Sequence, residues 1–189
     1  MRLVIAGAGG RMGRALIEEV LRSGDLKLAA ALEAPGSSAI GKDAGDLVGQ
    51  ACGVTIAADF GNEIARGDCL IDFTRPEGTL AHMEQCVEKG VRMVIGTTGF
   101  SVQENERIAA AAGRIAIVLA PNMSAGVNLA FRLAETAARA LGDAYDVEIV
   151  EAHHRHKIDA PSGTALKFGD AVARALGRDL ARTAVYGRK

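Results

Sequence analysis

The stretch that decides the fold is Leu3-Val4-Ile5-Ala6-Gly7-Ala8-Gly9-Gly10-Arg11-Met12-Gly13, close to the N-terminus of this 189-residue chain. Its apolar first part predicts a short strand that is buried on both faces. The glycines follow at once, and the apolar spacing of residues 12–22 after them predicts a helix. A strand, a glycine loop and a helix in this order form the context of a dinucleotide-binding fingerprint.

The glycines of this loop have separate expected roles. Gly7 allows the tight turn, and Gly9 or Gly10 lets the backbone approach a pyrophosphate held at the helix N-terminus. Gly13 permits close packing of the helix on the strand. The spacing is G-x-x-G-x-x-G, because Met12 stands where the strict fingerprint has its third glycine.

The rest of the first part repeats the rhythm of strand and helix. Further strands are expected at residues 28–32, 54–57, 69–73, 93–95 and 115–119, and a helix at residues 78–89. Ser101 and Glu104 form a capping box that opens another helix, which is expected to end at Gly113. The pattern predicts an α/β fold, a Rossmann-type doubly wound parallel sheet.

The rhythm changes after Pro121, where we expect a second domain. A helix is predicted at residues 127–141, a strand at residues 147–152 and a helix at residues 163–176. The expected division is a dinucleotide-binding domain at residues 1–124 and a substrate-binding and oligomerisation domain of α+β type at residues 125–189. This second domain is expected to be incomplete at its C-terminus, because no closing strand or helix follows.

Composition narrows the class of protein. The net charge of −1 and the aromatic content of 4% argue against nucleic acid as a partner. The apolar N-terminal run is too short for a signal peptide or a membrane span. Cys52, Cys69 and Cys86 are odd in number and have no motif spacing, which fits a reducing compartment. We therefore expect a cytoplasmic protein without membrane contact, with Cys69 buried in a strand.

Glu33 stands at the end of the second predicted strand, where a carboxylate can accept hydrogen bonds from the adenosine ribose. Without the glycine loop it would be read as a solvated loop residue. Ala34 follows it, and no cation stands there to meet a 2′-phosphate, so NADH is favoured over NADPH. Arg11 could substitute for that cation, which leaves NADPH open.

Two more loops follow predicted strands, at residues 96–100 and 120–124. Parallel sheets bind ligands at the carboxyl ends of their strands, so these loops could reach the nicotinamide ribose and carboxamide. Ordinary turn chemistry explains the same Gly, Pro, Asn and Ser residues equally well.

A basic loop precedes the last predicted helix, and it contains His153, His154, His156 and Lys157. Hydride transfer to an unsaturated substrate generates a carbanion or enamine that needs a proton, which a histidine or lysine can supply. The amides of Gly163 and Thr164, at the start of that helix, can meet a carboxylate. A metal site, a solvated basic edge or an oligomer contact are the alternatives; Lys157 would oppose a metal cation.

Four motifs together resemble the bacterial 4-hydroxy-tetrahydrodipicolinate reductase family, also called dihydrodipicolinate reductase. They are Gly7-Ala8-Gly9-Gly10-Arg11-Met12-Gly13, Asp72-Phe73-Thr74-Arg75-Pro76-Glu77-Gly78, Gly96-Thr97-Thr98-Gly99-Phe100, and Glu151-Ala152-His153-His154-Arg155-His156-Lys157 through Gly163-Thr164-Ala165. The resemblance runs over the whole chain. It implies NAD(P)H-dependent reduction of 4-hydroxy-tetrahydrodipicolinate, a small cyclic dicarboxylate, to tetrahydrodipicolinate on the diaminopimelate route to lysine.

The resemblance also implies residue roles. His153 would be the catalytic proton donor and acceptor, Lys157 a proton donor, and His154 with the Gly163 and Thr164 amides would hold substrate carboxylates. The cofactor site would be lined by Gly7, Ala8, Gly9, Gly10, Arg11, Met12, Glu33, Gly96, Thr97, Thr98, Ala120, Pro121, Asn122 and Met123. No metal is implied, and the assembly would be a homotetramer if the substrate domain is complete.

This chain departs from the family in two ways: many members carry an arginine where Ala34 stands, and members are longer. Two rival functions remain. One is another small-acid dehydrogenase on the same fold, and the other is a nicotinamide-sensing protein that catalyses nothing. The cluster of proton donors argues against both.

Overall fold

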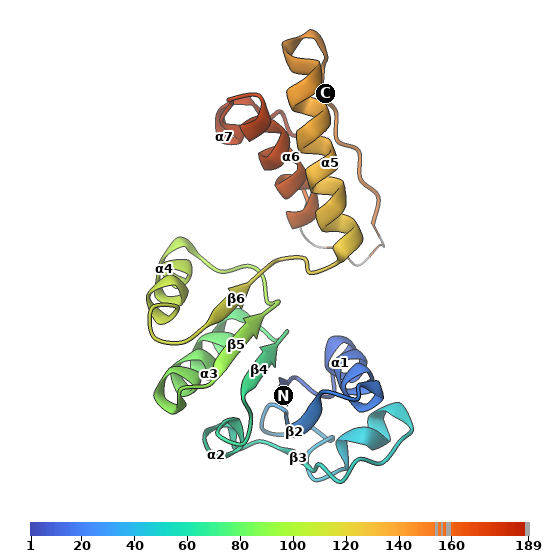
Figure 1. The fold of residues 1–189 in the computed structure, drawn as a ribbon, viewed down its shortest axis with the longest axis vertical. Helices are drawn as coiled ribbons and strands as arrows, with labels where there is room; N and C mark the ends of the chain where they lie inside the picture. Colours follow the sequence, from blue (N-terminus) through green and yellow to red (C-terminus); the bar gives the residue numbers. More distant parts are fainter. Residues whose placement is uncertain (154, 156, 158–159, 188–189) are drawn as a thin grey trace. The chain divides into compact units, whose positions relative to one another are not determined.

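The structure is a computed structural model that describes residues 1–153, 155, 157 and 160–187 (Figure 1). The chain divides into two compact units, Met1–Ala120 and Pro121–Lys189. The division falls a few residues before the boundary expected from the sequence.

The first unit is built on one sheet of six strands in the order β3-β2-β1-β4-β5-β6, and every neighbouring pair is parallel. The strands are β1 (Arg2–Ala6), β2 (Lys27–Leu32), β3 (Ile56–Ala57), β4 (Cys69–Asp72), β5 (Arg92–Ile95) and β6 (Ile117–Leu119). The order reverses at β1, so the carboxyl ends of β1 and β4 flank the switch point where such sheets bind ligands. The predicted doubly wound parallel sheet is confirmed.

Helices cover both faces of this sheet. On one face lie α1 (Arg11–Arg22) and the 3₁₀ helix η1 (Ala44–Val48), which bury Ile17 and Ala44 against the strands. On the other face, α2 (Phe60–Ile64), α3 (Pro76–Lys89) and α4 (Val102–Ala111) contribute Ile64, Met83 and Ile108 to the larger core. The strands between are apolar on both faces because both faces are covered.

The helix ends follow the capping signals of the sequence. The capping box of Ser101 and Glu104 is present at the start of α4. Pro76 opens α3, and Gly90 ends it with φ +69°, a left-handed conformation that glycine adopts without strain. The expected end of α4 at Gly113 is slightly late, since the helix stops at Ala111 and Ala112 caps it.

The third strand is shorter than predicted. Only Ile56–Ala57 pairs with β2, whereas the preceding residues bond to the loop at 41–44: Ala44 N donates to Val54 O at 2.8 Å. That loop is held by the carboxylate of Asp43, which accepts from the backbone N–H groups of Gly45, Cys52 and Gly53. The competing hydrogen bonds of this loop therefore take residues 54–55 out of the sheet.

These bonds give the acid stability of the fold a local origin. The backbone and side-chain hydrogen bonds from Cys52 hold the pKa of Asp43 at about 2. A depressed folded-state pKa stabilises the fold above the usual aspartate pKa, and that stabilisation is lost as the pH falls from about 4 towards 2. We expect Asp43→Asn to lower the melting temperature at pH 6, with the difference from the wild type narrowing through that window. Melting curves against pH check this, with the exposed Asp25→Asn as control; a difference that stays constant with pH would contradict it.

The second unit consists of helices and extended chain among its described residues. Its elements are α5 (Ala125–Leu141), η2 (Gly142–Ala144), α6 (Gly163–Ala175) and α7 (Leu180–Thr183). The Phe131 ring of α5 meets the Phe168 ring of α6 edge to face, with centroids 4.6 Å apart. Across the part of the chain that the structure describes, no helix is long and apolar enough to cross a membrane.

The strand predicted at residues 147–152 is wrong. The segment is extended but belongs to no strand, and all six strands of the described chain lie in the first unit. A strand requires a hydrogen-bonded partner, and apolar alternation alone does not supply one. Without a neighbouring strand, Val150 remains 93% exposed.

Candidate functional site

The glycine loop sits at the carboxyl end of β1. Gly7 has φ +69°, and the N–H of Gly10 donates to Gly7 O at 3.0 Å, which closes the tight turn. A Cβ added to Gly13 would lie 2.1 Å from Gly7 O and 2.7 Å from Ala8 Cα. Backbone stands in the way on that side, so α1 can approach the turn this closely only with glycine at position 13.

Glu33 follows β2 and faces the same loop. Its Oε1 accepts from the N–H of Gly9 at 2.8 Å, and its Oε2 from the N–H of Ala34 at 3.1 Å. The pairing holds the carboxylate beside the glycines while Oε2 retains room to accept a further bond.

The first turn of α1 is open to an anion. Gly10 gives no side-chain capping bond, and no acidic residue stands in the first turn, whereas serines cap α4, α5 and α6. Arg11 and Met12 are exposed there. A helix start without a side-chain cap, glycines at the approach and the Glu33 carboxylate beside it fit a dinucleotide pyrophosphate and its adenosine ribose.

The other predicted cofactor residues follow β5 and β6. Gly96 N donates to Asp72 O at 2.8 Å, and a Cβ on Gly96 would lie 1.9 Å from the Phe73 ring. Thr97 is buried at 5% exposure, and Ala120 N donates to Ile95 O at 3.1 Å. Because β1, β2, β5 and β6 run parallel, the loops that follow them share one edge of the sheet.

The next three predicted residues belong to the second unit. Pro121 and Met123 lie in the segment before α5, and Asn122 Oδ1 accepts from Ser124 N at 2.9 Å. Ser124 is the N-cap of α5, so Asn122 and Ser124 together shape the start of that helix.

Sequence analysis missed the functional interest of a buried polar cluster at the same edge of the first unit. Asp72, the last residue of β4, is fully buried with Thr79, His82 and Thr97 around it. An acid at the end of an apolar strand, with threonine two residues later, was the available signal. Asp72 and Thr74 belong to one of the four motifs that resemble the reductase family, but the resemblance implied no role for them.

The basic loop of the second unit is tied together by Glu151. This carboxylate accepts from the N–H of Ser162 at 2.8 Å and also from its hydroxyl, and Ser162 caps α6 through Ala165 N. His153 Nδ1 lies 3.4 Å from Glu151 Oε2. The two Ser162 bonds, followed by the charges of His153 and Lys157, hold the pKa of Glu151 below its usual range. Glu151 therefore links His153 to the helix start that contains Gly163 and Thr164.

The remaining residues of the loop are placed unevenly. His153 is exposed, Lys157 is half-buried, and Gly163 and Thr164 form the first turn of α6. His154 and His156 lie outside the described residues. Among the residues that are described, no group of three His, Cys, Asp or Glu side chains could hold a metal ion.

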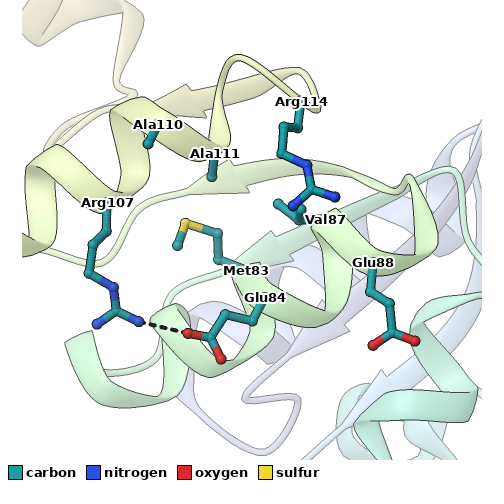
Figure 2. A pocket seen from close by; sticks show the side chains of 8 residues that line it. All are labelled: Met83, Glu84, Val87, Glu88, Arg107, Ala110, Ala111 and Arg114. Carbon is teal, nitrogen blue, oxygen red and sulfur yellow. Dashed lines mark hydrogen bonds and ion pairs between the residues drawn. The ribbon is translucent and has the colours of Figure 1, made fainter.

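Two grooves accompany these features. One, of about 810 Å³, runs along α6 in the second unit and includes Glu151, Pro161 and Ala165. The other, of about 480 Å³, lies between α3 and α4, where Arg107 pairs with Glu84 at 2.7 Å across an apolar floor (Figure 2). No predicted site residue lines the second groove, whereas the first reaches the loop of Glu151.

Comparison with known proteins gives one consistent family. Residues 1–123 match the family model described as dihydrodipicolinate reductase, N-terminus, and residues 126–187 match the one described as dihydrodipicolinate reductase, C-terminus. The chain is 57% identical over 189 residues to a 4-hydroxy-tetrahydrodipicolinate reductase of Nitrosomonas europaea, and 59% identical over 188 residues to one of Dechloromonas aromatica. Both matches cover 100% of this chain and 70% of the relative.

A solved structure agrees with the sequence matches. A dipicolinate-bound dihydrodipicolinate reductase from Paenisporosarcina sp. TG-14 superposes with a TM-score of 0.73 at 29% identity. The match covers 93% of this chain and 66% of that chain.

Proposed function

The chain belongs to the dihydrodipicolinate reductase family, and from that premise we propose that it reduces 4-hydroxy-tetrahydrodipicolinate to tetrahydrodipicolinate with NAD(P)H and a proton, the hydroxyl group leaving as water. This is an oxidoreductase step on the diaminopimelate route of lysine biosynthesis. The observation that carries the proposal on this chain is the carboxylate of Glu151, which connects His153 with the N-terminus of α6 and so joins a proton donor to an anion-binding helix start.

The first unit, with Pro121, Asn122 and Met123 after it, supplies the dinucleotide site in this proposal. The first-turn amides of α1 and the loop Gly7–Met12 hold the pyrophosphate, and Glu33 accepts from the adenosine ribose. Residues Gly96, Thr97, Thr98, Ala120, Pro121, Asn122 and Met123 hold the nicotinamide half. When bound, the nicotinamide supplies the hydride, and the protein supplies position and charge.

The second unit supplies the proton and the grip on the substrate. His153 donates and accepts the proton, with its Nδ1 directed at Glu151 so that Nε2 is left for the substrate. Lys157 donates a second proton, and the Gly163 and Thr164 amides, with His154, hold the substrate carboxylates. The chain thereby offers both groups that reduction of a cyclic dicarboxylate requires.

We propose NADH as the preferred cofactor. Ala34 is exposed directly after Glu33 and brings no cation to a 2′-phosphate. Within the glycine loop, the exposed Arg11 is a cation that could pair with the 2′-phosphate and so allow NADPH to bind instead of NADH. We propose further that the enzyme works in the cytoplasm and, where its substrate domain is complete, as a homotetramer.

The proposal is tested by following the absorbance of NADH or NADPH while dihydrodipicolinate synthase generates the substrate from pyruvate and aspartate semialdehyde. Oxidation that depends on the synthase supports the reductase and ranks the cofactors. NADH binding without oxidation favours the sensing protein instead. Oxidation with a different small acid, and none with the synthase, favours another dehydrogenase.

Glu33 gives a direct test of the adenosine end. We expect Glu33→Ala to raise the NADH dissociation constant by about tenfold, because ribose hydroxyls lose a charged acceptor and Gly9 N loses its partner. Fluorescence titration with NADH measures this, with the exposed Glu106→Ala on α4 as control. An unchanged dissociation constant would remove Glu33 from the site.

A further inference from the structure

We propose that the buried Asp72–His82 pair is a positioning element for the nicotinamide half of the cofactor site, acting through Thr79 and Thr97. The inference rests on the proposed function, in which residues 96–98 hold that half. None of the four side chains is assigned a chemical step, and all four are buried at the carboxyl edge of the sheet.

Asp72 is the centre of the arrangement. Its Oδ2 lies 2.6 Å from His82 Nδ1. Its Oδ1 accepts from the N–H of Thr74 at 2.8 Å and lies 3.1 Å from Thr79 Oγ1 and 3.3 Å from Thr97 Oγ1. One carboxylate thus connects the end of β4, the first half of α3 and the loop after β5.

The partners keep this carboxylate charged although it is out of water. Burial alone would raise the pKa of Asp72, but the bonds from His82 and Thr74 hold it below its usual range. The His82 ring is itself held in place, stacked on the Phe60 ring with centroids 3.9 Å apart. A buried carboxylate is costly unless its partners are complete, so the geometry around it tolerates little displacement.

Thr79 transmits this rigidity to the cofactor loop. Its hydroxyl donates to Thr97 Oγ1 at 2.8 Å, and this hydrogen bond fixes the orientation of the Thr97 side chain. Gly96 N also donates to Asp72 O, so the loop is bonded to the end of β4 through both its backbone and its side chains. Loss of the Thr79–Thr97 bond would leave the average position of the loop unchanged but would let it sample more positions. A ligand that requires one of these positions would then bind more weakly.

The test compares two ligands on the same variants. NADH uses both halves of the site, whereas ADP, which lacks the nicotinamide and its ribose, uses only the half held by the glycine loop and Glu33. We expect Thr79→Val, which keeps volume and removes the hydroxyl, to raise the NADH dissociation constant about tenfold and to leave that of ADP within about twofold. Asp72→Asn should weaken NADH binding at least as much as Thr79→Val does. Thr79→Ser keeps the hydroxyl, so its NADH affinity should be close to that of the wild type.

Thr79→Val is a more specific test than Asp72→Asn. The Asp72 carboxylate also bonds Thr74, whose methyl group lies against Gly7, so a change at Asp72 can disturb the glycine loop as well. The control for Asp72→Asn is Asp68→Asn, the same substitution at the residue just before the other end of β4, where the carboxylate pairs with Arg2 at 2.7 Å. Asp68→Asn should leave both affinities unchanged. Equal weakening of NADH binding and ADP binding by Thr79→Val, or no weakening of either, would overturn the inference. A wild type that fails to bind NADH would instead overturn the proposed function.

Discussion

Replacing His153 by alanine is expected to lower kcat by about 10²–10⁴-fold, the range that a positioned general acid contributes. The NADH dissociation constant should stay within about twofold, because in the proposed site the pyrophosphate and ribose contacts belong to the glycine loop and Glu33. The physical reason is the position of His153: its Nδ1 lies 3.4 Å from Glu151 Oε2, and its other ring nitrogen is the one that we propose to serve the substrate.

Lys157→Ala should behave in the same way, since the proposed second proton donor is lost while the proposed cofactor site is untouched. Arg155→Ala is the matched control, because Arg155 is an exposed cation in the same loop and has no proposed role. Steady-state kinetics on the three variants measure kcat, and NADH titration measures cofactor affinity separately. Weaker NADH binding with unchanged kcat, or equal losses for Arg155→Ala, would refute the assignment.

Gly13→Ala is expected to abolish NADH binding and to destabilise the first unit. The added Cβ would lie 2.1 Å from Gly7 O, and neither backbone segment can withdraw without opening the turn. Overpacking of this kind costs about 1–3 kcal/mol or more in stability, and the displaced loop would no longer hold its amides at the proposed pyrophosphate position.

The control for this variant is Gly24→Ala, at a glycine whose added Cβ meets nothing within 4 Å. Denaturant unfolding and NADH titration are the measurements. Wild-type stability and affinity in Gly13→Ala would show that the close approach of α1 to the glycine turn is not required.

The fold of the first unit followed closely from the sequence because its signals are local. Apolar runs, the glycine turn and the Ser101–Glu104 box each act within a few residues, and the parallel sheet follows from their alternation. The shortened β3 was not predictable in this way, since the hydrogen bonds of Asp43 bring together residues that lie apart in sequence.

The second unit and the polar cluster show where local reasoning stops. Residues 147–152 have the composition of a strand, but pairing depends on a partner that composition does not reveal. Asp72 and His82 are ten positions apart and meet only because α3 returns over the end of β4. His154, assigned to the substrate by resemblance, lies outside the described residues.

The most direct test of the central claim follows the hydride itself. NADH carrying deuterium at both C4 positions is mixed with the enzyme and with substrate made in situ by the synthase, and the tetrahydrodipicolinate is examined by mass spectrometry. The account predicts that each product molecule carries one deuterium, and that His153→Ala slows its appearance without changing the label. NADH oxidation that leaves the product unlabelled would contradict direct reduction of this substrate.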